Sequence, residues 1–112
     1  MKFKQVEGNF DCSNNQLKSI VGVPAHVSGN FSCDYNLLNS LVGGPARIGG
    51  SFYCDHNLLK SLVGVSMYVG KRFSCDNNKL ESLHYVHKEL KEVHGVISIY
   101  ENKIKHKFNK VT

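Results

Sequence analysis

The sequence of 112 residues contains no tryptophan, only two prolines and no long run of apolar residues. A membrane-spanning helix needs about 18 or more consecutive apolar residues, so the membrane class is excluded. No apolar stretch of signal-peptide length follows the first lysines, and we therefore expect a cytoplasmic protein whose thiols stay reduced. Hydrophobic residues make up 41% and charged residues 21%, as in ordinary folded domains, so we expect one folded domain over 1–112 rather than disorder.

What the sequence does contain is a repeat with a period of 21 residues. Each column of the repeat keeps one residue type over four units. The columns are Phe10, Phe31, Phe52 and Phe73; Cys12, Cys33, Cys54 and Cys75; Asn15, Asn36, Asn57 and Asn78; and Leu17, Leu38, Leu59 and Leu80. Residues of one type at equal steps predict stacked structural units that share one continuous core.

A fifth unit follows after a step of 24 residues instead of 21. Ile97, Ile99, Asn102 and Ile104 then occupy the Phe, Cys, Asn and Leu columns. The three extra residues lie where the glycine and proline of the earlier units are missing, and apolar residues there keep helical spacing. This segment predicts a short helix near 84–92.

Two segments point to a known family. Phe31–Leu38 (FSCDYNLL) and Ile97–Ile104 (ISIYENKI) fit the L-x-L-x-x-N-x-L pattern of leucine-rich repeats. From Val6 to about Ile104 the chain resembles the short leucine-rich-repeat proteins of bacteriophages and the short-repeat bacterial effectors. It departs from the usual pattern because a valine set slightly early, with a glycine soon after it, replaces the first leucine.

The resemblance implies a β-rich, leucine-rich-repeat-like solenoid. We expect about five 21-residue units with one short parallel strand each, repeats over 6–104, and cap strands over 1–5 and 105–112. The asparagine column is expected to bond backbone groups of the turns that would otherwise be buried without partners.

The four cysteines allow three interpretations: two disulfides, a zinc site, or small buried side chains. Their spacing of 21 differs from the C-x2-C pairs of zinc sites, and isoleucine fills the same column in the fifth unit. Core packing is therefore favoured over metal or redox chemistry. His84, His87 and His94 are expected to be solvated residues of the inserted segment rather than a metal clip. We expect no metal and no cofactor.

The net charge of +5 comes largely from the two terminal segments. Lysines alternate there with apolar residues, as on protected edge strands. They are Lys2, Lys4, Lys103, Lys105, Lys107 and Lys110. The repeat body between them is close to neutral. Nucleic-acid binding through the terminal lysines is therefore an alternative function, although the aromatic residues are expected on the acidic face rather than among the lysines.

The strand positions that face away from the core hold the candidate site. Asp34, Asp55 and Asp76 directly follow cysteines in adjacent units, where they either accept backbone N–H bonds in turns or form an acidic strip for a partner. Tyrosines and a histidine flank this column, and tyrosine is enriched at the centres of protein interfaces. The expected partner-binding residues are Asp34, Tyr35, Tyr53, Asp55, His56, Asp76 and Tyr100.

No motif of a known enzyme class occurs in the sequence, so we expect no catalytic activity. The leading hypothesis is a protein-binding module that contacts a partner with a basic surface. The resemblance to phage proteins implies a role in host takeover, by inhibition of a host or antiviral-defence protein. Self-association through an end strand or the sheet face is a further possibility.

Overall fold

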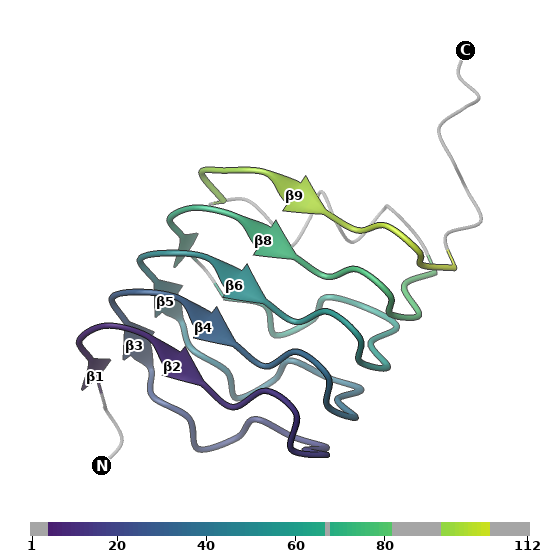
Figure 1. Ribbon diagram of the computed structural model, residues 1–112, viewed down its shortest axis with the longest axis horizontal. Coiled ribbons are helices and arrows are strands. Elements are labelled where there is room, and N and C mark those ends of the chain that lie inside the picture. The colour runs from purple at the N-terminus through teal and green to yellow at the C-terminus, as the bar shows by residue number, and fades with distance from the viewer. Residues whose placement is uncertain (1–4, 67, 82–92, 104–112) are drawn as a thin grey trace.

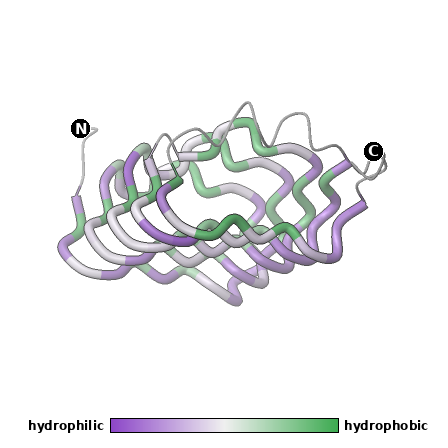
Figure 2. The backbone as a smooth tube through the Cα atoms, turned by 90° about the horizontal axis from the view of Figure 1, so that it is seen from above, coloured by the Kyte–Doolittle hydropathy of each residue, from purple (hydrophilic) through white to green (hydrophobic). Residues whose placement is uncertain are grey.

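The computed structural model describes residues 5–66, 68–81 and 93–103, which wind into a parallel β-solenoid (Figure 1). Successive turns lie in register, and hydrophobic and hydrophilic stretches recur at matching places of each turn (Figure 2). The prediction of a β-solenoid is therefore confirmed. The helix expected near 84–92, the C-terminal cap and most of the N-terminal cap lie outside the described residues.

Each of the first four turns contributes two short strands, one to each of two parallel sheets, where the sequence analysis expected only one strand. We call the four-stranded sheet sheet A and the five-stranded sheet sheet B. Sheet A contains β1 (Gln5–Val6), β3 (His26–Val27), β5 (Arg47–Ile48) and β7 (Tyr68–Val69). Sheet B contains β2 (Phe10–Asp11), β4 (Phe31–Ser32), β6 (Phe52–Tyr53), β8 (Phe73–Ser74) and β9 (Ile97–Ser98).

Strand pairing follows the sequence period. Phe31 pairs with Phe52 and Phe52 pairs with Phe73, each a step of 21 residues. Phe73 then pairs with Ile97, and Val69 forms a parallel bridge with Val93, each a step of 24 residues. The shifted fifth unit is thereby confirmed, because the three extra residues leave the strand register intact.

The core consists of stacked columns of like side chains. Phe31, Phe52 and Phe73 are at most 1% exposed, and neighbouring rings stand 5.3–5.4 Å apart in edge-to-face contact. Aromatic pairs favour this geometry because the positive edge of one ring meets the negative face of the next. The leucine columns complete this core, in which Leu38, Leu41, Leu59, Leu62 and Leu80 are buried.

The cysteine column packs in this core, as predicted. Cys33, Cys54 and Cys75 are fully buried, Cys12 is half-buried, and all four thiols are free. Burial raises the pKa values of the Cys33 and Cys54 thiols well above the usual range, because the low-dielectric interior disfavours a thiolate. Neutral thiols in this position behave as small apolar side chains.

The asparagine column holds successive turns together, as the sequence predicted. Asn57 Oδ1 accepts a hydrogen bond from the backbone N–H of Leu38 in the preceding turn. Its Nδ2 group donates to the carbonyl oxygens of Cys54 in its own turn and Cys33 in the preceding turn, at 3.2 and 3.1 Å. Nδ2 also donates to the carbonyl oxygen of Asp55 at 3.2 Å, so one amide bonds four backbone groups at a place where the chain turns and no strand can supply partners.

A second polar column connects the turns between the two sheets, and the sequence analysis missed it. Asn9 Oδ1 accepts from Asn30 N, and Asn30 Oδ1 accepts from Ser51 N, both at 2.8 Å. Ser51 Oγ then accepts from Arg72 N at 3.1 Å. The column was inconspicuous in the sequence because a serine and an arginine follow the two asparagines.

Replacing Asn57 by alanine should lower the free energy of unfolding by about 2–3 kcal/mol, because buried backbone donors and acceptors lose their partners. Urea unfolding followed by circular dichroism measures this change. Asn39→Ala is the matched control, since Asn39 is exposed and makes no hydrogen bond within the described residues. Equal stabilities of the two variants would contradict the bonding role of the asparagine column.

Candidate functional site

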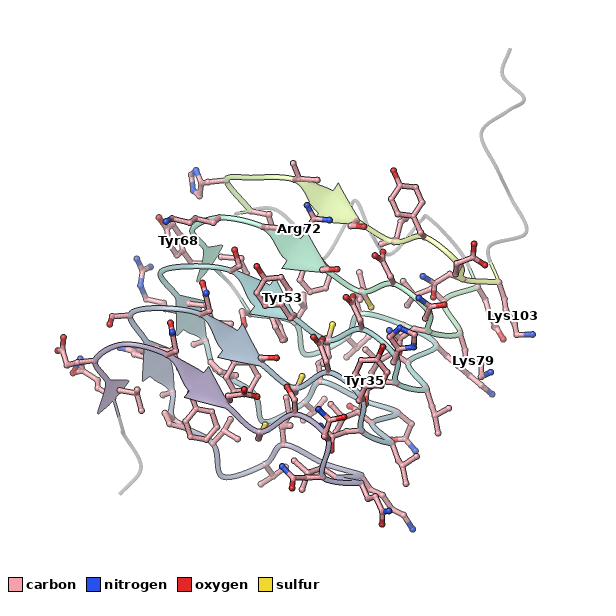
Figure 3. All side chains as sticks on the ribbon, in the orientation of Figure 1. Tyr35, Tyr53, Tyr68, Arg72, Lys79 and Lys103 are labelled. Carbon is pink, nitrogen blue, oxygen red and sulfur yellow. The ribbon has the colours of Figure 1, made fainter. Side chains whose placement is uncertain are left out.

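Three columns of side chains form the outward face of sheet B. The first two columns lie on this face because they alternate with the phenylalanines and cysteines that point into the core, although Ser74 and Ser98 are themselves buried. The third column directly follows the second, where each strand has ended. The first column is Asp11, Ser32, Tyr53, Ser74 and Ser98; the second is Ser13, Asp34, Asp55, Asp76 and Tyr100; the third is Asn14, Tyr35, His56, Asn77 and Glu101. All seven residues predicted for partner binding lie on this face, and Figure 3 shows Tyr53 on its strand and Tyr35 beyond the strand ends.

The aspartates form a hydrogen-bonded ladder along the second column. Asp34 Oδ1 accepts from the backbone N–H of Asp55 at 2.7 Å, and Asp55 Oδ1 accepts from the N–H of Asp76 at 2.8 Å. Asp76 Oδ1 accepts from the N–H of Tyr100 at 2.8 Å. The side chains of Asp55 and Asp76 also accept from the hydroxyls of Ser74 and Ser98, both at 2.7 Å.

This ladder bears on the two interpretations of the aspartate column. The carboxylates do accept backbone N–H bonds, but from the next turn of the solenoid rather than from their own turn. Asp11, which belongs to the first column, instead accepts a local hydrogen bond from Ser13 N. These bonds all engage Oδ1, so Oδ2 of Asp34, Asp55 and Asp76 has no hydrogen-bond partner among the described residues. A structural role and a contact with a partner are therefore compatible.

The half-buried Asp34 carboxyl is the most perturbed acid of the ladder. Burial raises its pKa to about 6, and the charge of the neighbouring Asp55 acts in the same direction. The hydrogen bond from the Asp55 N–H and the nearby His56 lower this pKa, but they do not offset the burial.

The third column has an unusual backbone. Its residues all lie in the left-handed region, with φ between 54° and 59°. Asparagine tolerates this region, whereas a bulky residue such as Tyr35 or His56 does so at a cost. These two rings stack face to face, with centroids 4.2 Å apart and planes 9° apart. Tyr35 is nevertheless 54% exposed, so the stack presents much of its surface to solvent.

Two exposed leucines, which the sequence analysis did not single out, lie on the same two turns. Leu37 is 40% exposed and Leu58 is 41% exposed, whereas their neighbours Leu38 and Leu59 are fully buried. The doubled leucines were the available signal, because consecutive side chains of an extended chain face opposite ways. We call Tyr35, Leu37, His56 and Leu58 the apolar patch.

Tyr100 lies apart from the apolar patch, on the last described turn, and is 73% exposed. An open hollow of 310 Å³ is lined by residues of the last two turns. They are Asn77, Asn78, Lys79, Glu101, Asn102 and Lys103. No group of three or more histidine, cysteine, aspartate or glutamate side chains that could hold a metal ion occurs within the described residues.

Among these described residues there is also no helix long and apolar enough to cross a membrane. His94 is described and stands with its ring 5.1 Å from that of Tyr68, whereas His84 and His87 fall in the part of the chain that the structure does not describe.

Comparison of the chain with protein-family models, with curated proteins and with solved structures finds no match. The resemblance to short leucine-rich-repeat proteins therefore stays a prediction, and the geometry of this face carries the functional argument.

The raised pKa of Asp34 predicts a pH dependence of stability. Because the folded-state pKa of about 6 lies above the ordinary value of 3.8, this group stabilises the fold fully below about pH 4 and loses that contribution as the pH rises through 6. Asp34→Asn keeps an oxygen for the Asp55 N–H but cannot ionise. We expect the variant to gain stability relative to the wild type between pH 4 and pH 7.

Thermal unfolding of the two proteins from pH 3.5 to 7.5 measures this difference. Glu81→Gln, an exposed carboxylate off the ladder, is the control. A constant difference between Asp34→Asn and the wild type over this range would show that burial does not penalise the Asp34 carboxylate.

Proposed function

We propose that the protein is a non-enzymatic binding module that contacts a partner protein through the outward face of sheet B. The observation that carries this proposal is the exposed Tyr35–His56 stack, with Leu37 and Leu58 exposed on the same turns. Exposed apolar surface of this kind is costly in water, and burying it against a partner recovers hydrophobic free energy.

The patch has the properties of an interface centre. The rings of Tyr35 and His56 are already held against each other, so they lose little conformational freedom when a partner covers them. Tyrosine also combines a large apolar surface with a polar hydroxyl, which suits a site that is wet before binding and dry afterwards. The backbone beneath the rings is fixed by inter-turn hydrogen bonds from Tyr35 N and His56 N, each 2.9 Å long.

The charge next to the patch supports a basic partner. Asp34, Asp55 and Asp76 form a row of carboxylates directly beside the column that holds the stacked rings. Such a row attracts lysine and arginine side chains and accelerates their approach more than it strengthens the final complex. We therefore propose a partner whose contact surface is basic at its rim and apolar at its centre.

We also propose the biological role that the resemblance to phage proteins implies. A phage protein of this kind would bind and inhibit a host or antiviral-defence protein. The shape of the face is consistent with binding rather than catalysis, since its side chains project from flat strands and the described hollow beside it is open to solvent. Nucleic-acid binding through the terminal lysines remains the alternative, and Lys105, Lys107 and Lys110 lie outside the described residues.

Replacing Tyr35, Leu37 and Leu58 together by serine should abolish capture of the partner from a lysate of the candidate host. The matched control replaces Val21, Val42 and Val63 by serine, because these valines are 73%, 53% and 50% exposed and lie off the sheet B face. A protein retained by the wild type and the valine variant but lost with the patch variant is the expected result. If both variants retain the captured protein, or if both lose it, the interface lies elsewhere on the molecule.

Replacing Asp55 and Asp76 by asparagine tests the charge separately from the fold. Asparagine retains Oδ1, so the ladder bonds to Asp76 N and Tyr100 N are preserved while two charges are removed. We expect weaker binding of the captured partner and a flatter dependence of affinity on salt, measured by titration calorimetry at two ionic strengths. Glu7→Gln with Glu81→Gln removes the same charge elsewhere, and equal effects of the two pairs would exclude a specific role for the aspartates.

A further inference from the structure

The core columns are covered on both sides in the middle turns, but not in the first and the last described turn. Phe31, Phe52 and Phe73 are at most 1% exposed, whereas Ile97, which continues their column, is 39% exposed and Val96 beside it is 59% exposed. Figure 1 shows β2 and β9 as the outermost strands of sheet B. The apolar side chains of the first turn that pack only partly against the core are Phe10, Cys12 and Leu17.

We call the side of the first turn that faces away from the second turn the first-turn end, with Phe10, Cys12 and Leu17. The opposite side of the last described turn, with Ile97 and Ile99, is the last-turn end. Both ends expose members of the same columns, because Ile97 follows the phenylalanine column and Ile99 follows the cysteine column. The two ends therefore present similar apolar side chains in the same arrangement.

The backbone at the last-turn end offers hydrogen-bond donors. In sheet B each turn donates N–H groups to carbonyl oxygens of the following turn, as Phe73 N does to Val96 O at 2.9 Å. No turn follows the fifth among the residues that the structure describes. The N–H groups of Ile97 and Ile99, which occupy the same columns as the donors of earlier turns, consequently have no acceptor there.

The backbone at the first-turn end offers the matching acceptors. Asn30 O and Ser32 O of the second turn accept from the first turn, and Phe10 N donates to Asn30 O at 2.9 Å. Asn9 O and Asp11 O occupy the same positions one turn earlier. They accept no hydrogen bond from a preceding turn in the described part of the chain.

The asparagine column is incomplete at the first-turn end as well. Asn36 Oδ1 accepts from the N–H groups of Asn15 and Leu17 in the preceding turn, at 2.9 and 2.8 Å, and its Nδ2 donates to Cys12 O. Asn15 begins the column. Its Nδ2 bonds only its own turn, and its Oδ1 accepts from no described residue. An amide that connects two turns elsewhere thus connects none here.

We propose that the first-turn end of one copy of this chain stacks on the last-turn end of a second copy, so that the protein associates head to tail. Continuing the register of the internal turns pairs Ile97 N and Ile99 N of one copy with Asn9 O and Asp11 O of the other. The same register places Phe10 over Ile97 and buries both. A second copy supplies donors, apolar side chains and turn spacing together, because its end is itself a turn of this repeat.

Such a contact joins two different surfaces, so each added copy leaves one end of each kind available. A head-to-tail contact that does not close into a ring produces open chains of copies rather than a fixed dimer. Lysines are concentrated in both terminal segments of the sequence, and like charges oppose the contact. Salt screens this repulsion, and we therefore expect association to strengthen as the salt concentration rises.

Sedimentation velocity and light scattering over a concentration range of about 10 µM to 1 mM test the proposal. The wild type should increase from 12.5 kDa, the mass of one chain, to beyond that of a dimer. Leu17→Lys and Ile97→Lys each place a charge at one end while the lysine stem keeps part of the apolar contact. Each variant should weaken association by at least about 10-fold.

Mixing these two variants distinguishes a head-to-tail contact from other contacts. Leu17→Lys retains an intact last-turn end and Ile97→Lys retains an intact first-turn end, so the mixture should form one-to-one dimers although neither variant associates alone. The control is Val63→Lys, because Val63 is 50% exposed in the third turn and belongs to neither end. It should associate like the wild type, and circular dichroism confirms that each variant is folded.

Three results would overturn the proposal. A wild type that stays at 12.5 kDa up to the highest concentration would exclude the contact. Equal weakening by Val63→Lys and Ile97→Lys would place the contact away from the ends. A mixture of the two end variants that stays monomeric would show that unlike ends do not pair. The apolar patch on sheet B belongs to neither end, so capture of a partner protein tests the proposed function independently of these results.

Discussion

The rest of the structure depends on one constraint. Where the chain bends away from the strands of sheet B, buried backbone groups need hydrogen-bond partners that no strand supplies. The asparagine column meets this constraint, because each amide bonds its own turn and a neighbouring turn at once. The side chains of Asn36 and Asn57 therefore stabilise a turn and attach it to the preceding turn at the same time. A single turn on its own would leave half of these bonds unmade, which is why a solenoid of this kind folds as an array.

The same device recurs at two other places, with different side chains. Asn9 and Asn30 connect the turns between the sheets, and Asp34, Asp55 and Asp76 connect them on the outward face of sheet B. In each case a side-chain oxygen accepts the N–H of the residue 21 or 24 positions later. The fold itself thereby holds the aspartates in place, and this arrangement costs stability at neutral pH because Asp34 is half-buried.

The outward surfaces of the two sheets differ in charge. The face of sheet B combines acidic side chains with the Tyr35–His56 stack, while the side of sheet A combines Arg47 with Tyr68. The formal charge of +5 gives no hint of this separation, since it sums over both surfaces and the termini. One small solenoid thus presents acidic side chains on one surface and basic side chains on another.

The sequence by itself determined the solenoid, the register of its repeats and the core columns, but not the second strand of each turn. Columns such as Phe31, Phe52 and Phe73 allow only one register, because a slip would bury polar residues and expose the rings. It also predicted which residues share the sheet B face. Only the tertiary structure decided that Leu37 and Leu58 are exposed, that the aspartates bond the next turn, and that Tyr68 lies against Arg47. The physical reason is that these features depend on contacts between side chains of neighbouring turns. The repeat predicts which residues are stacked, but not how their side chains pack against one another.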